Sequence, residues 1–320
     1  MIIFPHSPPP KGGVGSFQLR FQNFLSRNNI NYLTVSSLTS FAPFCYVFGG
    51  TRKLFWLFLY KLRGGYVIHR LDGLNWQHTI AYPGFLKYLK AYIRLLLVRL
   101  IRRYFADHLI YQSKFIQDWW HIKYPISKPS TVIYNSIHID NILLPLNNIK
   151  TIDIICIEGE INAIPAINIL NSLIAYNVHL FGDIDKDLKP YLSNKVIFHG
   201  YVNHELLYQS LISAKIYLCL ETNPPCPNSV IEALAHGIPI LGFDSGSLKE
   251  LVGDAGIILP YGTNPWLLET PNLLNLNNEI KYLLENYDYF SKQARMRASR
   301  LFNDDINCQV YIDIAEAFKK

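Results

Sequence analysis

The stretch CLETNPPCPNSVIEALAHGIPILGFDSGSLKELV spans residues 219–252 and decides the fold. Its pattern predicts a short strand that ends near Leu220, a proline-rich loop, a helix over 228–236, and a second strand over 238–243 before a glycine turn. Strand, helix and strand in this order form a parallel α/β unit. Ligands of such sheets bind beside the carboxyl ends of the strands, so we expect a site at this loop.

The start of the predicted helix has the features of an anion site. The prolines exclude helix before Asn228, which predicts Asn228 as the N-cap and Ser229 in the first turn. The exposed amides of a helix start attract phosphate. Glu232 follows one turn later, and a carboxylate tolerates a nearby anion when it accepts hydrogen bonds from sugar hydroxyls. The spacing therefore favours a nucleotide, with its phosphates on the helix start and its ribose on Glu232.

Residues 226–251 resemble the donor-binding segment of the retaining glycosyltransferases of family four, which have the GT-B fold. The signature of that family is two glutamates separated by seven residues, followed by Ala and then Gly-x-Pro. The second glutamate falls on Glu232, and the first falls on Pro224. Glu221, three residues earlier, is the nearest carboxylate that a bent loop would deliver in its place.

Other segments resemble the same family in the same order along the chain. PPKGGVGSF at residues 9–17 is similar to its N-terminal glycine loop, which implies donor contact at Gly13. ADHLIYQSKF at 106–115 and VIYNSIHID at 132–140 are similar to the end of its first domain. Asn135 stands where the family usually has Asn-Gly beside the donor.

The resemblance implies an α/β protein of the GT-B type, in which two Rossmann-like parallel-sheet domains face each other across a cleft. We expect an N-terminal acceptor-side domain over 1–143, a nucleotide-sugar-binding domain over 144–305, and a terminal helix over 306–320 that packs back on the first domain. The alternation of predicted strands and helices after residue 150 agrees with a second parallel sheet.

The same resemblance implies a transfer of a sugar, with retention, from a nucleotide-diphosphate sugar to a saccharide or lipid-linked saccharide in surface polysaccharide biosynthesis. The departing phosphate takes the acceptor proton, so the protein positions the reactants and stabilises negative charge. The expected catalytic residues are Asp72, Arg70 and Glu221. The expected donor-binding residues are Glu232, Asn228, Ser229, Gly246, Lys249, Gly13 and Asn135. A structural Arg70–Asp72 pair that holds a loop explains those two residues equally well.

One departure keeps a second function open. The family usually carries an Arg and a Lys after the first strand of its second domain, where this chain reads EGEINAIPA at 158–166. Lys11, Arg70 and Lys249 are candidate replacements. The alternative is a GT-B-like protein without turnover that serves as a binding or scaffold subunit of a glycan assembly complex. An epimerase needs acid and base groups that the sequence does not reveal.

Composition limits the other classes. Half of the 320 residues are hydrophobic and 17% are charged, which is typical of a globular protein. The five cysteines include no Cys-x-x-Cys pair, which favours reduced thiols over a disulfide framework or zinc. Asp183-Ile184-Asp185 matches Asp-x-Asp, but its setting favours a solvated helix start, and we expect no metal and no cofactor.

Basic and apolar residues combine in two segments, residues 52–63 and a predicted helix over 86–105. Such a helix lies on an anionic membrane, and it is equally typical of a core helix with a solvated basic face. The net charge of +6 suits anionic partners, but no nucleic-acid motif is present. No signal peptide or span is recognisable, so we expect a cytoplasmic protein, with attachment to the inner membrane face as the open alternative.

Overall fold

The computed structural model describes residues 1–320 except 10–12, 74–75, 78–79, 81–83, 140–148 and 319–320. The chain divides into two compact units. Unit 1 comprises Met1–Asn135 and Asp304–Lys320, and unit 2 comprises Ser136–Asn303. The predicted domain boundary at residue 143 lies outside the described residues.

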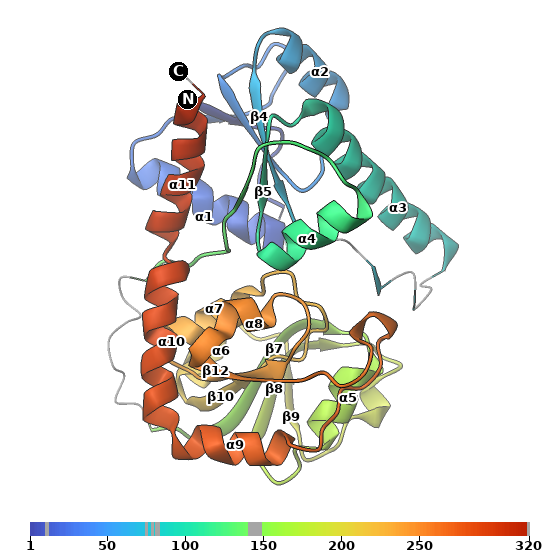
Figure 1. The fold of residues 1–320 in the computed structure, drawn as a ribbon, viewed down its shortest axis with the longest axis vertical. Helices are drawn as coiled ribbons and strands as arrows, with labels where there is room; N and C mark the ends of the chain where they lie inside the picture. The colour runs from blue at the N-terminus through green and yellow to red at the C-terminus, as the bar shows by residue number, and fades with distance from the viewer. Residues whose placement is uncertain (10–12, 74–75, 78–79, 81–83, 140–148, 319–320) are drawn as a thin grey trace. The chain divides into compact units, whose positions relative to one another are not determined.

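Unit 1 is a parallel six-stranded sheet in the order β2-β1-β3-β4-β5-β6 with helices on both faces (Figure 1). Its strands are β1 (Ile2–Phe4), β2 (Tyr32–Thr34), β3 (Phe44–Phe48), β4 (Tyr66–Leu71), β5 (His108–Tyr111) and β6 (Ser130–Val132). Its helices are α1 (Gly13–Arg27), α2 (Leu54–Leu62), α3 (Phe85–Leu100), the π-helical turn η2 (Ile101–Phe105), α4 (Lys114–Lys123) and α11 (Asp304–Ala317).

The terminal helix α11 belongs to the core of unit 1 and lies against α1 (Figure 1). Tyr311 is fully buried among Phe17, Phe21 and Tyr46, and the Tyr46 hydroxyl donates to its carbonyl at 2.6 Å. Arg27 pairs with Asp304 at 3.2 Å at the start of α11. Aromatic burial of this kind is worth several kcal/mol in a core, so the last helix completes the first unit.

Unit 2 is a second parallel sheet, in the order β12-β11-β10-β7-β8-β9. Its strands are β7 (Ile152–Ile161), β8 (Val178–Ile184), β9 (Ile197–Gly200), β10 (Ala214–Leu218), β11 (Ile240–Phe243) and β12 (Gly256–Leu259). Its helices are α5 (Ile164–Asn171), α6 (His204–Ile212), α7 (Asn228–Ala235), α8 (Leu248–Val252), α9 (Leu276–Glu285) and α10 (Tyr287–Leu301). The expected second parallel sheet is therefore present.

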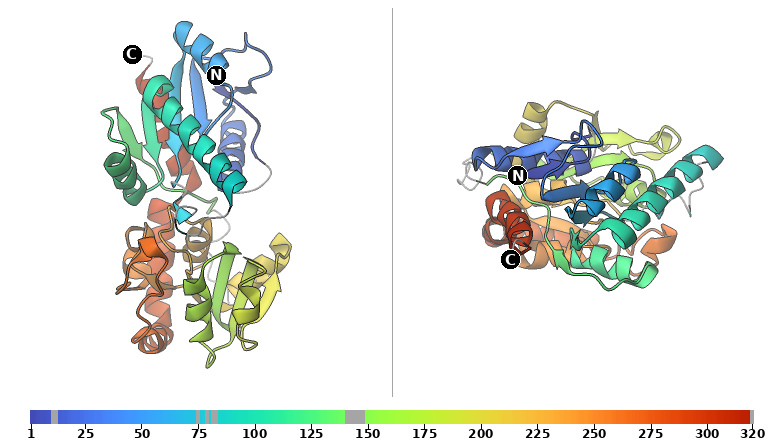
Figure 2. Two further views of the ribbon diagram at one scale, coloured as in Figure 1. Left: turned by 90° about the vertical axis from the view of Figure 1, so that its right-hand side faces the viewer. Right: turned by 90° about the horizontal axis from the view of Figure 1, so that it is seen from above.

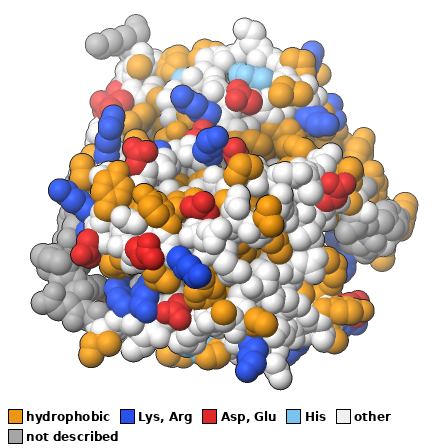
Figure 3. Space-filling view, turned by 60° about the horizontal axis from the view of Figure 1, so that its bottom comes forward, with side chains coloured by type: hydrophobic (Ala, Val, Ile, Leu, Met, Phe, Trp, Pro, Cys, Tyr) orange, Lys and Arg blue, Asp and Glu red, His pale blue; other side chains and the backbone are white. Residues whose placement is uncertain are grey.

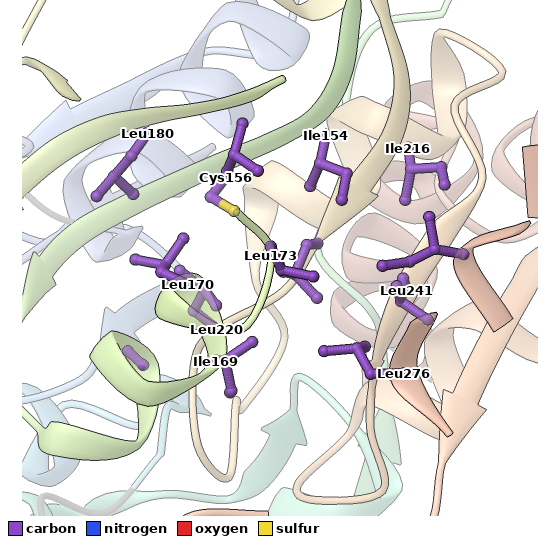
Figure 4. Packing of buried hydrophobic residues seen from close by; sticks show 14 of the residues in the cluster. Ile154, Cys156, Ile169, Leu170, Leu173, Leu180, Ile216, Leu220, Leu241 and Leu276 are labelled. Atoms are coloured by element: carbon purple, nitrogen blue, oxygen red, sulfur yellow. The ribbon is translucent and has the colours of Figure 1, made fainter. Parts of the chain in front are cut away.

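Aliphatic side chains fill one face of this sheet (Figure 4). Ile154, Cys156 and Leu180 from the strands pack with Leu170 and Leu173 from the region of α5. Strands buried on both faces need near-continuous apolar sequence, and IDIICI in β7 supplies it. The five cysteines are all free and buried, in agreement with reduced thiols.

Three local predictions are wrong in detail. Strand β7 continues through a bulge to Ile161, where a loop was expected, because Glu160 pairs with Asp183 of β8. Asp183 and Ile184 therefore end a strand and do not start a helix. Pro227 caps α7 in place of Asn228, because its fixed φ of −68° holds the extended cap conformation and its carbonyl accepts the Ile231 amide.

The surface shows two further features. On the face seen in Figure 3, basic and acidic side chains are interspersed, and neither sign dominates.

Among the described residues, no helix combines the length and apolar content that a bilayer span requires. Helix α3 lies at the front of unit 1 in the left view of Figure 2.

The close approach of Gly182 to β7 gives a testable prediction. A β-carbon on Gly182 would lie 1.8 Å from the carbonyl oxygen of Glu158, and its φ of +115° disfavours other residues. Gly182→Ala should lower the free energy of unfolding by about 2–4 kcal/mol, measured by urea denaturation of the intact chain. Gly159→Ala meets no atom within 4 Å and is the matched control, expected within about 0.5 kcal/mol of wild type. Equal effects of the two changes would contradict this account.

Candidate functional site

In unit 2, the loop after β10 is fixed by the loop after β11. Asn223 is buried with a left-handed φ of 52°, and its amide donates to the Ser245 hydroxyl at 3.1 Å. The Ser247 amide donates to the Pro224 carbonyl at 2.8 Å. Because β10 and β11 are parallel neighbours, both loops leave the sheet at its carboxyl edge. The segment between Glu221 and α7 therefore has one defined path.

Gly246 allows the loop after β11 to approach the loop after β10 closely. Its φ is +60°, and a β-carbon there would lie 2.4 Å from the nitrogen of Pro224. The predicted donor residue Gly246 thus has a structural reason for being glycine, which is to let the two loops touch. Lys249, the predicted phosphate ligand on the same side, is mostly exposed and pairs with Asp244 at 3.2 Å.

Helix α7 begins directly after this loop, with Asn228 and Ser229 in its first turn. The first amides of a helix have no intrahelical acceptor and provide partial positive charge. Asn228 and Ser229 are both partly exposed, so the start of the helix is accessible in unit 2. Glu232 lies one turn later and is half-buried, and its carbonyl accepts from the His236 ring at 2.7 Å.

A pair of carboxyl groups lies at the same edge of the sheet. Glu158 of β7 accepts the Leu220 amide at 3.0 Å. Burial, with a contribution from the Glu221 carboxylate, raises the pKa of Glu158 to about 8. Glu221 is exposed at the surface, so the half-buried Glu158 is the member of the pair whose proton is best protected. The two carboxyl groups hold at least one proton at neutral pH.

In unit 1, Arg70 of β4 is the centre of a buried polar network. Its guanidinium donates to Asp72 at 2.5 Å, to Gln112 at 3.1 Å and to Asn135, and it lies over the Phe17 ring at 4.1 Å. Arg70 is 1% exposed and Asn135 is 5% exposed. Their roles as direct ligands stay predictions, and the burial of both side chains favours a structural role. Arg70 positions Asp72.

Asp72 is the member of this network that reaches the surface, with a quarter of its side chain exposed. Its carbonyl accepts the Trp120 indole N–H at 3.0 Å. A pocket of about 500 Å³ opens beside it, lined by Gly49, Arg52, Arg94 and Trp120 among others. Apolar walls with a few convergent polar groups are typical of small-molecule sites.

Buried His69 shapes the glycine turn of this pocket. Burial lowers the pKa of His69 to about 4, so its ring is neutral and Nε2–H donates to the Gly49 carbonyl at 2.6 Å. Gly49 has a φ of +65°, and a β-carbon there would lie 3.5 Å from the Asp72 carboxylate. The glycine turn therefore lies close against that carboxylate.

The N-terminal glycine segment differs from its prediction. Gly13 begins α1, and a β-carbon on it would meet no atom within 4 Å. Gly15 is the sterically required glycine, because a β-carbon there would lie 2.0 Å from the Pro9 carbonyl. Lys11, a candidate phosphate ligand, lies outside the described residues.

The chain, with its two parallel sheets, can be compared with proteins of known structure. The chain superimposes with a TM-score of 0.70 on a sucrose-phosphate synthase from Thermosynechococcus elongatus, at 15% identity over 99% of both chains. It matches Anabaena HepE in complex with UDP-glucose equally well, with a TM-score of 0.70 and 16% identity over 99% of both chains. A glycosyltransferase from Rickettsia africae gives a TM-score of 0.68, at 12% identity over 100% of this chain and 98% of that one.

The fold is GT-B. Residues 179–299 also match the family model described as glycosyl transferases group 1. The segment that matches this family model includes the loop after β10, all of α7 and the loop after β11. The segment that matches the family model lies within unit 2. No curated protein sequence matches significantly.

Sequence reasoning missed three groups in these GT-B units. The sequence shows EGEI in 158–161, but only the pairing of β7 shows that Glu158 points toward the loop after β10. Gly49 and Gly50 are visible as a turn, yet their pocket depends on α3, which comes from 40 residues later. Arg52 and Arg94 become neighbours through the same packing.

The carboxyl pair predicts a pH dependence of stability. The folded-state pKa of Glu158 lies above the ordinary value of 4.5 for a glutamate, so its contribution to stability is present below that value and is lost as pH rises through about 8. Glu158→Gln keeps the acceptor for Leu220 and removes the titration. We expect this variant to gain stability over wild type progressively between pH 5 and pH 8, measured by urea denaturation. Exposed Glu160→Gln is the control, and a parallel trend in both variants would refute the assignment.

Proposed function

We propose that this GT-B protein transfers a sugar from a nucleotide-diphosphate sugar to a saccharide or lipid-linked saccharide, with retention, in surface polysaccharide biosynthesis. The single observation that carries the proposal is the fixed loop after β10, which delivers the start of α7 and Glu232 to the carboxyl edge of the unit 2 sheet. Retention, the hexosyl class and independence from metal follow from the resemblance of residues 226–251.

The donor binds at this edge in our proposal. The amides of the first turn of α7, at Asn228 and Ser229, bind the diphosphate, and Glu232 accepts hydrogen bonds from the ribose. HepE, which shares the fold, was solved with UDP-glucose, and this supports a nucleotide sugar as the ligand. Glu221 replaces the glutamate that Pro224 displaces and makes the contact to the sugar in its place.

The acceptor binds in the pocket of unit 1. Asp72 receives the acceptor hydroxyl, and the ion pair with buried Arg70 fixes the position of the Asp72 carboxylate. Arg52 and Arg94 line the same pocket, and neither has an ion pair among the described residues. Two guanidinium groups beside an apolar wall suit an acceptor that carries a phosphate, such as a lipid-linked saccharide.

Peripheral attachment to an anionic membrane fits the exposure of α3. The predicted apolar stripe does not enter the core, because none of the residues of α3 is buried. Its exposed large apolar residues are Phe85, Leu86, Tyr88, Leu89, Tyr92, Ile93 and Leu96. Lys87, Lys90 and Arg94 alternate with them, which is the pattern of a helix that lies in a membrane interface. We place the protein on the cytoplasmic face of the cell membrane.

A binding or scaffold subunit without turnover remains the second candidate. The observation that favours it is the acidic edge formed by Glu158 and Glu160, where related chains carry Arg and Lys. Purified protein incubated with a panel of UDP-, GDP- and ADP-sugars separates the two functions. A transferase releases the nucleoside diphosphate slowly by hydrolysis or faster with an acceptor, whereas a scaffold gives neither reaction.

Glu232→Ala tests the donor site. Loss of hydrogen bonds from two hydroxyls to a carboxylate should weaken nucleotide-sugar affinity about tenfold or more. Calorimetry with the nucleotide sugar that most raises the melting temperature of wild type is the measurement. Glu285→Ala, an exposed change on α9, is the control. Unaltered affinity in Glu232→Ala would remove this residue from the site.

Leu86→Asp tests the membrane face of α3. Leu86 is 71% exposed, so the change should not unfold the protein, but it places a charge in the apolar layer. Flotation with vesicles of phosphatidylglycerol and phosphatidylcholine should show binding reduced at least fivefold. Leu274→Asp, at a similarly exposed position in unit 2, should bind as wild type. Wild type that fails to float at physiological salt would exclude membrane attachment.

A further inference from the structure

A second pocket of unit 1 lies apart from Asp72, between the end of α3, η2 and the segment that follows α4. Its volume is about 520 Å³, within the range of about 300–1,000 Å³ of small-molecule sites. Four of the residues that line it are cationic: Arg99, Arg102, Arg103 and Lys123. None of its lining residues is acidic. We call it the α3–α4 pocket.

Arg102 carries a buried charge that has no carboxylate partner among the residues that the structure describes. It is 3% exposed, yet its partners are the Tyr124 carbonyl at 2.6 Å, the Tyr111 hydroxyl at 3.3 Å and the ring of Trp120. In the described part of the chain, no carboxylate forms a salt bridge with it, and its buried Nε–H has no acceptor. A buried guanidinium without a counterion is unfavourable. An anion bound from solution would therefore stabilise this one.

The nearby acid does not fill this role. Asp107 follows η2 in the chain, but it accepts from Lys61 at 2.6 Å and from the Val67 amide at 2.8 Å. Lys128, which donates to the Ala106 carbonyl, adds a further cation, and burial together with Lys61 and Arg102 lowers its pKa. Positive charge therefore accumulates at this end of α3.

The local backbone holds these cations together. The Ala106 amide bonds to the Ile101 carbonyl at 2.9 Å, five residues back, which is the π-helical spacing of η2. Such turns are rare and recur at functional sites. Arg99 lies over the Tyr124 ring at 4.1 Å, and the carbonyl of that same residue accepts from Arg102. Tyr124 thus contacts the guanidinium groups of both Arg99 and Arg102, and all three residues line the α3–α4 pocket.

Apolar residues border the pocket and connect it to the exposed face of α3. Leu96 is 40% exposed and belongs both to that face and to the pocket lining. Tyr104 also lines the pocket and is largely exposed, and the exposed Ile122 precedes Lys123. An anion bound here would have apolar surface directly beside it, which suits the headgroup of a lipid better than a free ion.

We propose that the α3–α4 pocket binds the phosphate of an anionic phospholipid headgroup. The exposed Arg103 and Lys123 donate to the phosphate oxygens, Arg99 and the buried Arg102 add positive charge, and the acyl chains extend along the exposed apolar residues of α3. This inference rests on the proposed membrane attachment and adds a specific headgroup site to it. The pocket is distinct from the acceptor pocket at Asp72, with which it shares no lining residue.

The test compares two double variants of the full chain that remove equal charge from exposed positions. Arg103→Ala with Lys123→Ala alters the pocket, and Lys87→Ala with Lys90→Ala alters the other end of the same region. Sedimentation with phosphatidylcholine vesicles that contain phosphatidylglycerol measures affinity at physiological salt. We expect the pocket pair to bind about tenfold more weakly than the control pair, because charge removal alone weakens both equally.

Inorganic phosphate separates a lipid headgroup from a free ion. If phosphate raises the melting temperature of wild type but not of the pocket pair, and vesicle binding is the same in both pairs, the site binds the free anion and the lipid proposal is overturned. Equal vesicle affinity of the two pairs without a phosphate effect also overturns it. Stabilisation by nucleotide sugar, measured in the same proteins, reports on the donor site separately, so its failure would not be confused with failure of the pocket.

Discussion

Parallel strand pairing is the constraint on which the rest of this structure depends. Every pair of neighbouring strands in both sheets is parallel, so every loop that follows a strand emerges at one edge of its sheet. In unit 2, this brings the loop after β10 against the loop after β11, where Gly246 permits contact with Pro224. In unit 1, the same rule brings the ends of β3, β4 and β5 around Arg70 and Asp72.

Buried charge distinguishes three places in the molecule. Arg70 is fully buried but paired with Asp72 and two amide oxygens, so its charge is neutralised inside the protein. The Glu158–Glu221 pair lowers its charge by holding a proton. Arg102 has no carboxylate partner within the described ranges of the chain, and its guanidinium keeps its proton at physiological pH. This difference is why Arg70 is assigned to structure, the glutamates to proton-dependent chemistry, and Arg102 to the binding of an anion.

The sequence predicted the site of unit 2 better than that of unit 1. The order of strand, loop and helix around Glu232 is local, so prolines and apolar spacing were enough to locate it within one residue. Arg70 and Asn135 were recognised as important but were assigned to ligand contact, because burial depends on residues far away such as Phe17 and Gln112. The pocket beside Asp72 was not foreseen, since its walls come from α1, β3, β4, α3 and α4.

The sequence by itself determined the alternation of strands and helices, the two parallel sheets, the start of α7, and the amphipathic character of residues 86–105, because each depends on periodicity and turn residues within one segment. Only the tertiary structure decided which side chains are buried. It placed Arg70 inside and the apolar stripe of α3 outside, and it left Arg102 without a counterion. The physical reason is that desolvation depends on all atoms that surround a group, and these come from parts of the chain that no local pattern connects.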